Sequence, residues 1–241
     1  MLVFDKKHKN ESISEFVLRV MKHNILNLNL KPGECINENS IAKELGVSRT
    51  PVREAFIKLA QDNLLEIYPQ KGTYISLIDL DMVEESKFVR KVLEKAVIES
   101  SFDNFNENNI LELEKNFHMQ EFYFKNKDHN HFFESDNQFH KLIFSACKKE
   151  RIYSFMESMN SHLTRLRVLR LSANVFIDLI LSQHKEILEA IKERNLDKVI
   201  NLMALHTAGN IIDVKTIKHL YPIYFKGSLI EKKEFSLPHP I

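Results

Sequence analysis

Residues 45–55, with the sequence Leu-Gly-Val-Ser-Arg-Thr-Pro-Val-Arg-Glu-Ala, carry the clearest local structural signals in the chain. Gly46 can end one helix, and Ser48 can cap the next helix, whose first turn tolerates Pro51. Apolar residues at helical spacing predict the inner face of this second helix: Val52, Ala55, Phe56 and Leu59. The stretch therefore predicts two helices joined by a tight turn.

Segments on both sides extend this pair into a small module. Upstream, apolar residues follow helical spacing over 13–28, and a short helix fits 39–45. Downstream, 64–68 and 73–77 have the composition of two strands joined by a short turn. The order helix, helix, helix, hairpin predicts a winged helix-turn-helix domain over residues 1–78.

The second helix of a helix-turn-helix lies in the major groove of DNA, with its N-terminal residues at the base edges. Arg49 and Arg53 are four residues apart and lie on one face, opposite the apolar side. Arginine binds guanine O6 and N7 through two hydrogen bonds. Taken alone, two such arginines are more typical of a solvated helix face. The candidate DNA contacts combine the helix start with the hairpin tip: Ser48, Arg49, Thr50, Arg53, Lys71 and Gly72.

Residues 79–241 predict a second, helical domain. No convincing strand follows residue 79, and the tail from about 215 has no clear pattern. The first predicted helix carries Val83 to Val97, and the others cover about 107–125, 131–147, 151–171, 175–194 and 196–214. The expected fold is therefore mainly α, with a winged helix-turn-helix followed by antiparallel helices.

Four side chains in this second domain have the spacing of a metal site. Asp136 and His140 lie four residues apart and share a helix face. His184 and His206 lie 11 residues before and after Asn195, so an antiparallel helix pair turning there would bring them to the same height. Three imidazoles and one carboxylate suit Zn²⁺, with Ni²⁺ or another transition metal as alternatives. A surface ion pair and core histidines remain alternative explanations.

Composition excludes several classes of protein. The 241 residues carry a net charge of +1, which excludes a globally basic nucleic-acid coat. Cys35 and Cys147 are too few for a disulfide framework. Neither a signal peptide nor a run of 18 apolar residues is visible, so we expect a cytoplasmic protein without a membrane span.

Three motifs together resemble the winged helix-turn-helix of the GntR family of bacterial transcription regulators. They are Leu30-Lys31-Pro32-Gly33, the stretch 45–55 and Lys71-Gly72-Thr73. The resemblance implies DNA contacts by Arg49, Thr50 and Arg53, with Ser48 and Gly72 near the backbone. Asn39 departs from the family, because many members have arginine there.

The second domain resembles the FadR-type, or FCD, subclass of that family. The matching segments are 136–140, 184–191 and 202–206. The resemblance implies an antiparallel helical bundle that binds a metal through one Asp and three His, with a small carboxylate completing the coordination. It also implies that Arg90 meets the carboxylate of the effector. Asn210, one turn beyond His206, is a further candidate effector contact.

These features predict a regulator rather than an enzyme. The expected protein is a homodimer, most readily a repressor, that binds operator DNA and responds to a small carboxylate at the metal. One alternative is a regulator that responds to the metal alone. A metal-dependent hydrolase is a weaker alternative, because the sequence shows no additional base at suitable spacing.

Overall fold

The computed structural model describes residues 1–173, 177–208 and 211–227. The chain divides into two compact units. The first unit combines residues 1–80 with 164–168 and with the described C-terminal residues 217–227. The second unit comprises residues 81–163 and 169–216.

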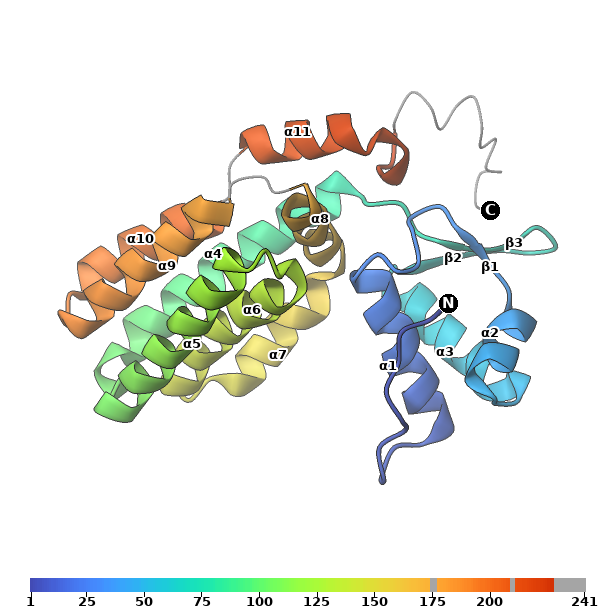
Figure 1. Ribbon diagram of the computed structural model, residues 1–241, viewed down its shortest axis with the longest axis horizontal. Helices are drawn as coiled ribbons and strands as arrows, with labels where there is room; N and C mark the ends of the chain where they lie inside the picture. Colours follow the sequence, from blue (N-terminus) through green and yellow to red (C-terminus); the bar gives the residue numbers. More distant parts are fainter. Residues whose placement is uncertain (174–176, 209–210, 228–241) are drawn as a thin grey trace. The chain divides into compact units, whose positions relative to one another are not determined.

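The first unit has three helices and a three-stranded antiparallel sheet in its N-terminal 80 residues (Figure 1). The strands lie in the order β1-β3-β2, and Tyr74 of β3 pairs with both Cys35 and Glu66. The elements are α1 (Ile13–Leu26), β1 (Cys35–Ile36), α2 (Glu38–Leu45), α3 (Arg49–Gln61), β2 (Leu65–Tyr68) and β3 (Gly72–Ile75). The predicted order is confirmed, and β1 is a short strand that the sequence did not predict.

Local signals set the boundaries of these helices. Ser12 and Glu15 form a capping box at the start of α1, which satisfies backbone N–H groups that have no partner inside the helix. Gly46 ends α2 with a left-handed φ of 66°, a conformation that suits glycine. Ser48 occupies the predicted N-cap position of α3, but its side chain makes no cap hydrogen bond. The hydroxyl of Ser48 is therefore not engaged by the helix start.

A C-terminal segment completes the first unit. Ile217 and Phe225 are fully buried, and Phe225 forms a parallel bridge with Ile78. The Ile78 amide donates to the carbonyl of Tyr224 at 2.8 Å, and Lys226 Nζ lies 2.9 Å from Asp79 Oδ2. The tail, in which no clear pattern was visible from the sequence, thus pairs with the residues that follow β3.

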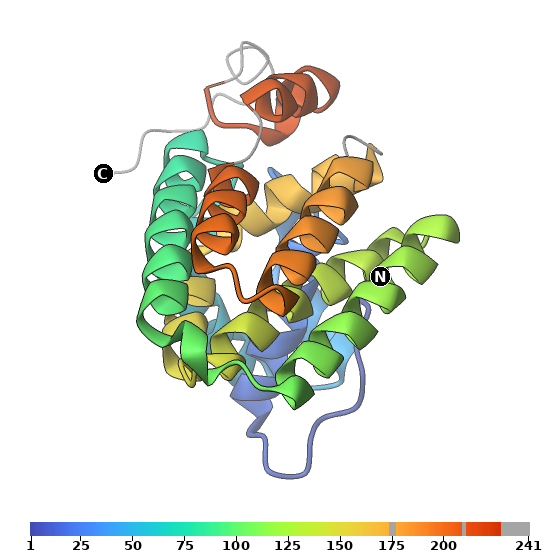
Figure 2. The same ribbon diagram turned by 90° about the vertical axis from the view of Figure 1, so that its left-hand side faces the viewer.

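The second unit is a bundle of antiparallel helices (Figure 2). Helix α5 packs against both α6 and α9, and α9 packs against α10. The elements from residue 80 onward are α4 (Leu80–Ser101), the 3-10 helix η1 (Phe102–Asn104), α5 (Glu107–Lys125), α6 (His129–Ala146), α7 (Glu150–Met159), α8 (Ser161–Ser172), α9 (Ile177–Lys192), α10 (Leu196–Ala208), α11 (Ile211–Leu220) and the 3-10 helix η2 (Pro222–Tyr224). Of these, 164–168 in α8 and the residues from 217 onward belong to the first unit.

The prediction of a single helix over 151–171 is wrong, because the helix is interrupted at Asn160, between α7 and α8. The buried Ser86 hydroxyl donates to the carbonyl of Met159 at 2.8 Å, which satisfies a carbonyl at the end of α7. The Asn160 side chain donates to Glu157 at 2.8 Å and further closes the helix end. These long-range and local side-chain contacts explain why apolar spacing alone did not reveal the break.

The turn expected near Asn195 is confirmed. Arg194 adopts a left-handed φ of 56°, and the Asn195 side chain accepts a hydrogen bond from the Lys198 amide at 3.0 Å. Helices α9 and α10 therefore run antiparallel from a tight turn, which sets the relative heights of the residues on them.

Candidate DNA-recognition surface and metal centre

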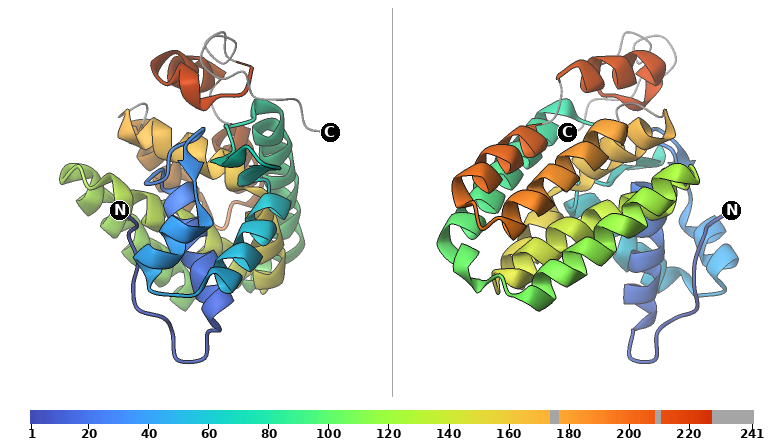
Figure 3. Two further views of the ribbon diagram at one scale, coloured as in Figure 1. Left: turned by 90° about the vertical axis from the view of Figure 1, so that its right-hand side faces the viewer. Right: turned by 60° about the vertical axis from the view of Figure 1, so that its left-hand side comes forward.

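The N-terminal turns of α3 present the predicted recognition residues to solvent. Ser48, Arg49, Thr50 and Arg53 are all exposed, while Val52 packs in the core beneath them. Helices α2 and α3 pack against each other, as in a helix-turn-helix (Figure 3, left). The arrangement leaves one face of α3 able to enter a major groove.

An acidic side chain lies beside this surface. Arg49 Nη2 donates to Glu38 Oε2 at 3.3 Å, and the Arg49 side chain is 66% exposed. An exposed pair of this kind contributes little to stability, about 0–1 kcal/mol. Arg49 can therefore leave Glu38 for a base or phosphate at small cost. The sequence alone did not single out Glu38, which is the first residue of α2 and precedes Asn39.

The tip of the hairpin is built for a tight turn. Lys71 is exposed, and Gly72 has a φ of 125°, which lies in a region that side chains rarely adopt. A Cβ at Gly72 would also lie 3.4 Å from the Tyr74 ring and from Cys35 Sγ. The turn therefore presents the Lys71 side chain next to a backbone that only glycine fits well.

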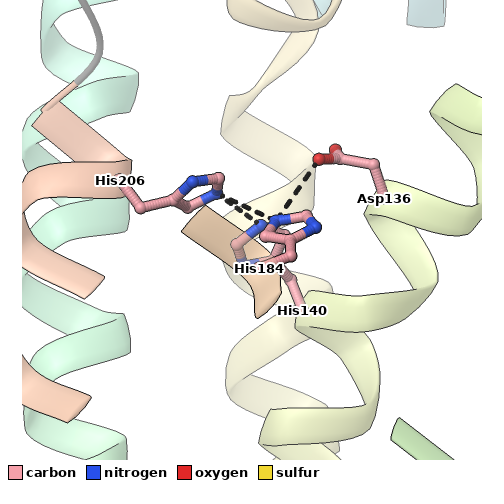
Figure 4. Close-up of side chains that lie close together, drawn as sticks. All are labelled: Asp136, His140, His184 and His206. Atoms are coloured by element: carbon pink, nitrogen blue, oxygen red, sulfur yellow. Dashed lines mark hydrogen bonds and ion pairs between the residues drawn. The ribbon is translucent and has the colours of Figure 1, made fainter. Parts of the chain in front are cut away.

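The four predicted metal ligands converge in the second unit (Figure 4). Asp136 and His140 come from α6, His184 from α9 and His206 from α10, and one ligand atom from each lies within 4.8 Å of the others. His184 is fully buried, Asp136 and His140 are 4% and 2% exposed, and His206 is half-buried. The alternative of a surface Asp–His pair is therefore wrong.

Two of the three histidines have an amide oxygen at hydrogen-bond distance from Nδ1, and the third has a carboxylate oxygen nearby. His184 Nδ1 lies 2.7 Å from Gln120 Oε1, and His206 Nδ1 lies 2.9 Å from Gln183 Oε1. His140 Nδ1 lies 3.2 Å from Glu94 Oε2. A carboxylate only accepts, so the proton of His140 belongs on Nδ1.

The orientation of the Gln120 amide follows from its own partners. Gln120 Nε2 donates to Asn116 Oδ1 at 2.7 Å, and Asn116 Nδ2 donates to the Ser135 carbonyl at 3.1 Å. A backbone carbonyl only accepts, so hydrogen-bond donation runs in one direction, from His184 through Gln120 and Asn116 to the Ser135 carbonyl. Gln120 therefore presents its oxygen to His184, whose proton also belongs on Nδ1.

Protons on Nδ1 of His140 and His184 leave the Nε2 lone pairs of these two rings directed toward His206 Nε2. His140 Nε2 and His184 Nε2 lie 3.1 Å and 3.3 Å from His206 Nε2, and His184 Nε2 lies 3.6 Å from Asp136 Oδ1. Facing lone pairs repel unless a cation lies among them. Three neutral imidazole nitrogens and one carboxylate oxygen are a donor set that Zn²⁺ and neighbouring transition metals accept, so these residues fit a metal ion.

Burial and a neighbouring positive charge keep His140 in its neutral, metal-binding form. Burial and the positive charge of Arg90 lower the pKa of His140 below its ordinary value, so this imidazole is neutral near pH 7. Burial would raise the pKa of Glu94, but His140 and Arg90 outweigh it and lower that pKa to about 2. Glu94 therefore remains a buried carboxylate beside the cluster.

Arg90 lies close to this centre, but it is not a free cation. Its Nε donates to Glu94 Oε1 at 2.6 Å, and its side chain is 9% exposed. The sequence predicted Arg90 and missed Glu94, although their i,i+4 spacing is the signal of a helical ion pair. Gln120 and Gln183 were missed because nothing in their spacing points to the cluster. Asn210 lies outside the described residues.

Within the described residues, no helix is both long enough and apolar enough to cross a lipid bilayer.

Comparisons with known proteins agree with this architecture. Residues 13–75 match the model of bacterial regulatory proteins of the gntR family, and residues 87–209 match the FCD domain. The chain is 29% identical over 206 residues to the HTH-type transcriptional repressor RspR of Escherichia coli, covering 86% of this chain and 90% of RspR.

The chain is also similar to a second repressor and, in fold, to a solved structure. The gluconate operon transcriptional repressor of Bacillus subtilis is 27% identical over 73% of this chain and 74% of its own length. The structure of E. coli McbR/YncC superposes with a TM-score of 0.72 at 19% identity, covering 87% of this chain and 99% of that one. Both family models match the units in which the recognition surface and the cluster lie. The chain therefore belongs to the GntR family and is a DNA-binding transcription regulator with an FCD domain, not an enzyme.

Proposed function

We propose that this regulator is a repressor whose operator affinity is controlled by a small carboxylate bound at a metal in the FCD domain. Asp136, His140, His184 and His206 hold the ion, and zinc is the metal that the donor set suits best. The single observation that carries the proposal is the convergence of one ligand atom from each of three histidines and one aspartate, all within 4.8 Å of one another. The positive charge of a bound ion would attract an anionic ligand to this buried position.

Arg90 supports a carboxylate as the organic ligand. It is connected to the cluster through Glu94 and His140, and a guanidinium binds a carboxylate well through paired hydrogen bonds. One of its nitrogens is engaged by Glu94, so Arg90 would bind the effector with its remaining donors.

For the DNA-binding unit we propose that Arg49, Thr50 and Arg53 contact base edges, while Ser48, Lys71 and Gly72 contact the backbone. Exposure of the side chains at the start of α3 and of Lys71 at the hairpin tip supports this assignment. We also propose a homodimer, because two recognition helices related by a twofold axis match an inverted repeat in the operator. Repressor names among the relatives support repression as the direction of control.

A second candidate is regulation by the metal alone. Four protein ligands already fill the tetrahedral coordination that structural zinc prefers, and Arg90 already has an acidic partner. In that case the ion needs no organic ligand to complete its site.

Titration of operator binding separates the two candidates. The purified chain is assayed by fluorescence anisotropy against a duplex selected from a random library, first with chelator, then with zinc, and then with zinc and each of a panel of small carboxylates. The proposal predicts that one carboxylate changes the affinity by about 5–150-fold only when zinc is present. A change with zinc alone supports the metal-responsive alternative, and no change in any arm contradicts both.

A further inference from the structure

Glu94 is the charged residue in the shell around the cluster that touches both a ligand and the candidate effector arginine. The other two Nδ1 acceptors, Gln120 and Gln183, are neutral amides. Glu94 is 1% exposed and comes from α4, a helix that contributes none of the four ligands. Its position therefore connects α4 to the ligand-bearing helix α6.

The two oxygens of Glu94 face different partners. Oε1 accepts from Arg90 Nε at 2.6 Å, and Oε2 lies 3.2 Å from His140 Nδ1. Within the part of the chain that is described, Oε2 and His140 Nδ1 have no hydrogen bond of ordinary geometry. The two atoms nevertheless face each other at 3.2 Å in a buried environment, so each can serve as the partner of the other.

We propose that Glu94 is a positioning residue that orients His140 toward the metal and ties this ligand to Arg90. The inference rests on the proposed metal site and deepens it. A carboxylate at Nδ1 fixes the imidazole tautomer and makes Nε2 a stronger donor to the ion. The same carboxylate holds the Arg90 guanidinium, so an effector that draws Arg90 toward itself also changes the partner of a metal ligand.

The charge of Glu94 is the feature that distinguishes this role from that of the two glutamines. Glu94→Gln keeps an acceptor oxygen of nearly the same size and removes the negative charge. It also removes the carboxylate to which Arg90 Nε donates, which by itself destabilises a buried cation. A second variant, Arg90→Gln combined with Glu94→Gln, removes both charges and thereby separates the two effects.

The test measures zinc affinity of the full chain by competition with a chromophoric chelator, and the ligand field with Co²⁺ as the spectroscopic probe. Glu99→Gln is the matched control, because Glu99 lies on the same helix, is 45% exposed and pairs only at the surface with Lys95 at 3.5 Å. Circular dichroism confirms that each variant is folded.

The expected result is a loss of about 10–100-fold in zinc affinity for Glu94→Gln and for the double variant, a changed Co²⁺ spectrum in both, and no change for Glu99→Gln. Wild-type affinity in the double variant would overturn the proposal, because the loss in Glu94→Gln would then come from the unpaired Arg90. Wild-type affinity in both variants would also overturn it. If the wild-type chain itself binds neither Zn²⁺ nor Co²⁺, the proposed function fails together with this inference, which distinguishes that failure from the other two.

Discussion

The two candidate sites of this regulator use opposite physical conditions. The recognition surface on α3 is exposed, and its residues come from one short stretch of sequence, 48–53. The metal cluster is buried, and its residues come from three helices that span 136–206. DNA has to reach the first site from outside, whereas an ion and its ligand in the second site must be shielded from bulk water. The comparison shows that a contiguous motif suffices for surface recognition, while a buried centre also depends on the packing of its supports.

Removing a buried ligand should have the largest effect. His184→Ala deletes a fully buried imidazole and removes the hydrogen-bond partner of Gln120 Oε1. We expect the zinc content after dialysis to fall to roughly a tenth of the wild-type value or less, measured by elemental analysis. His118→Ala is the matched control, since His118 is 74% exposed and pairs with Glu121. Equal zinc in the His184→Ala and control proteins would remove His184 from the site.

The two cysteines extend the same contrast to chemical reactivity. Burial raises the pKa of Cys147 to about 11, so roughly one molecule in a thousand carries the thiolate at pH 8. Cys35 is exposed on β1. We expect iodoacetamide to modify the buried Cys147 much more slowly than the exposed Cys35, and the rate at Cys147 to rise about tenfold per pH unit until the pH approaches 11. Mass spectrometry of the Cys35→Ser and Cys147→Ser variants assigns the rates, and similar rates would contradict the buried position of Cys147.

Removing one recognition arginine should have a smaller effect than either. Arg49→Ala or Arg53→Ala should weaken operator binding by about tenfold, consistent with about 1–3 kcal/mol for a good contact to guanine. Lys58→Ala is the control, because Lys58 lies at the other end of α3 and pairs with Asp62 at 3.4 Å. A gel-shift titration in which all three variants bind like wild type would exclude this face of α3 as the recognition surface.

Much of this arrangement could be predicted from the sequence because its signals are local. Gly46, Ser48 and the apolar face of α3 gave the helix-turn-helix, and equal spacing around Asn195 gave the heights of His184 and His206. These predictions depend only on helical periodicity and on one tight turn.

The remainder depends on contacts between elements that are distant in the sequence. The break at Asn160 is stabilised by Ser86, which lies 73 residues before Met159. The acceptor for His184 is Gln120, 64 residues away, and the partner of His140 is Glu94 on another helix. Helical spacing does not determine the register of one helix against another, so these supports appear only in the folded structure.

The central claim is that three histidines and one aspartate from α6, α9 and α10 hold a single ion. Anomalous diffraction at the zinc absorption edge, from crystals of the zinc-loaded full chain, tests it most directly. The account predicts one strong anomalous peak about 2.0–2.2 Å from Asp136, His140, His184 and His206, with the histidines bound through Nε2. A peak elsewhere, or no peak among these four side chains, would contradict it.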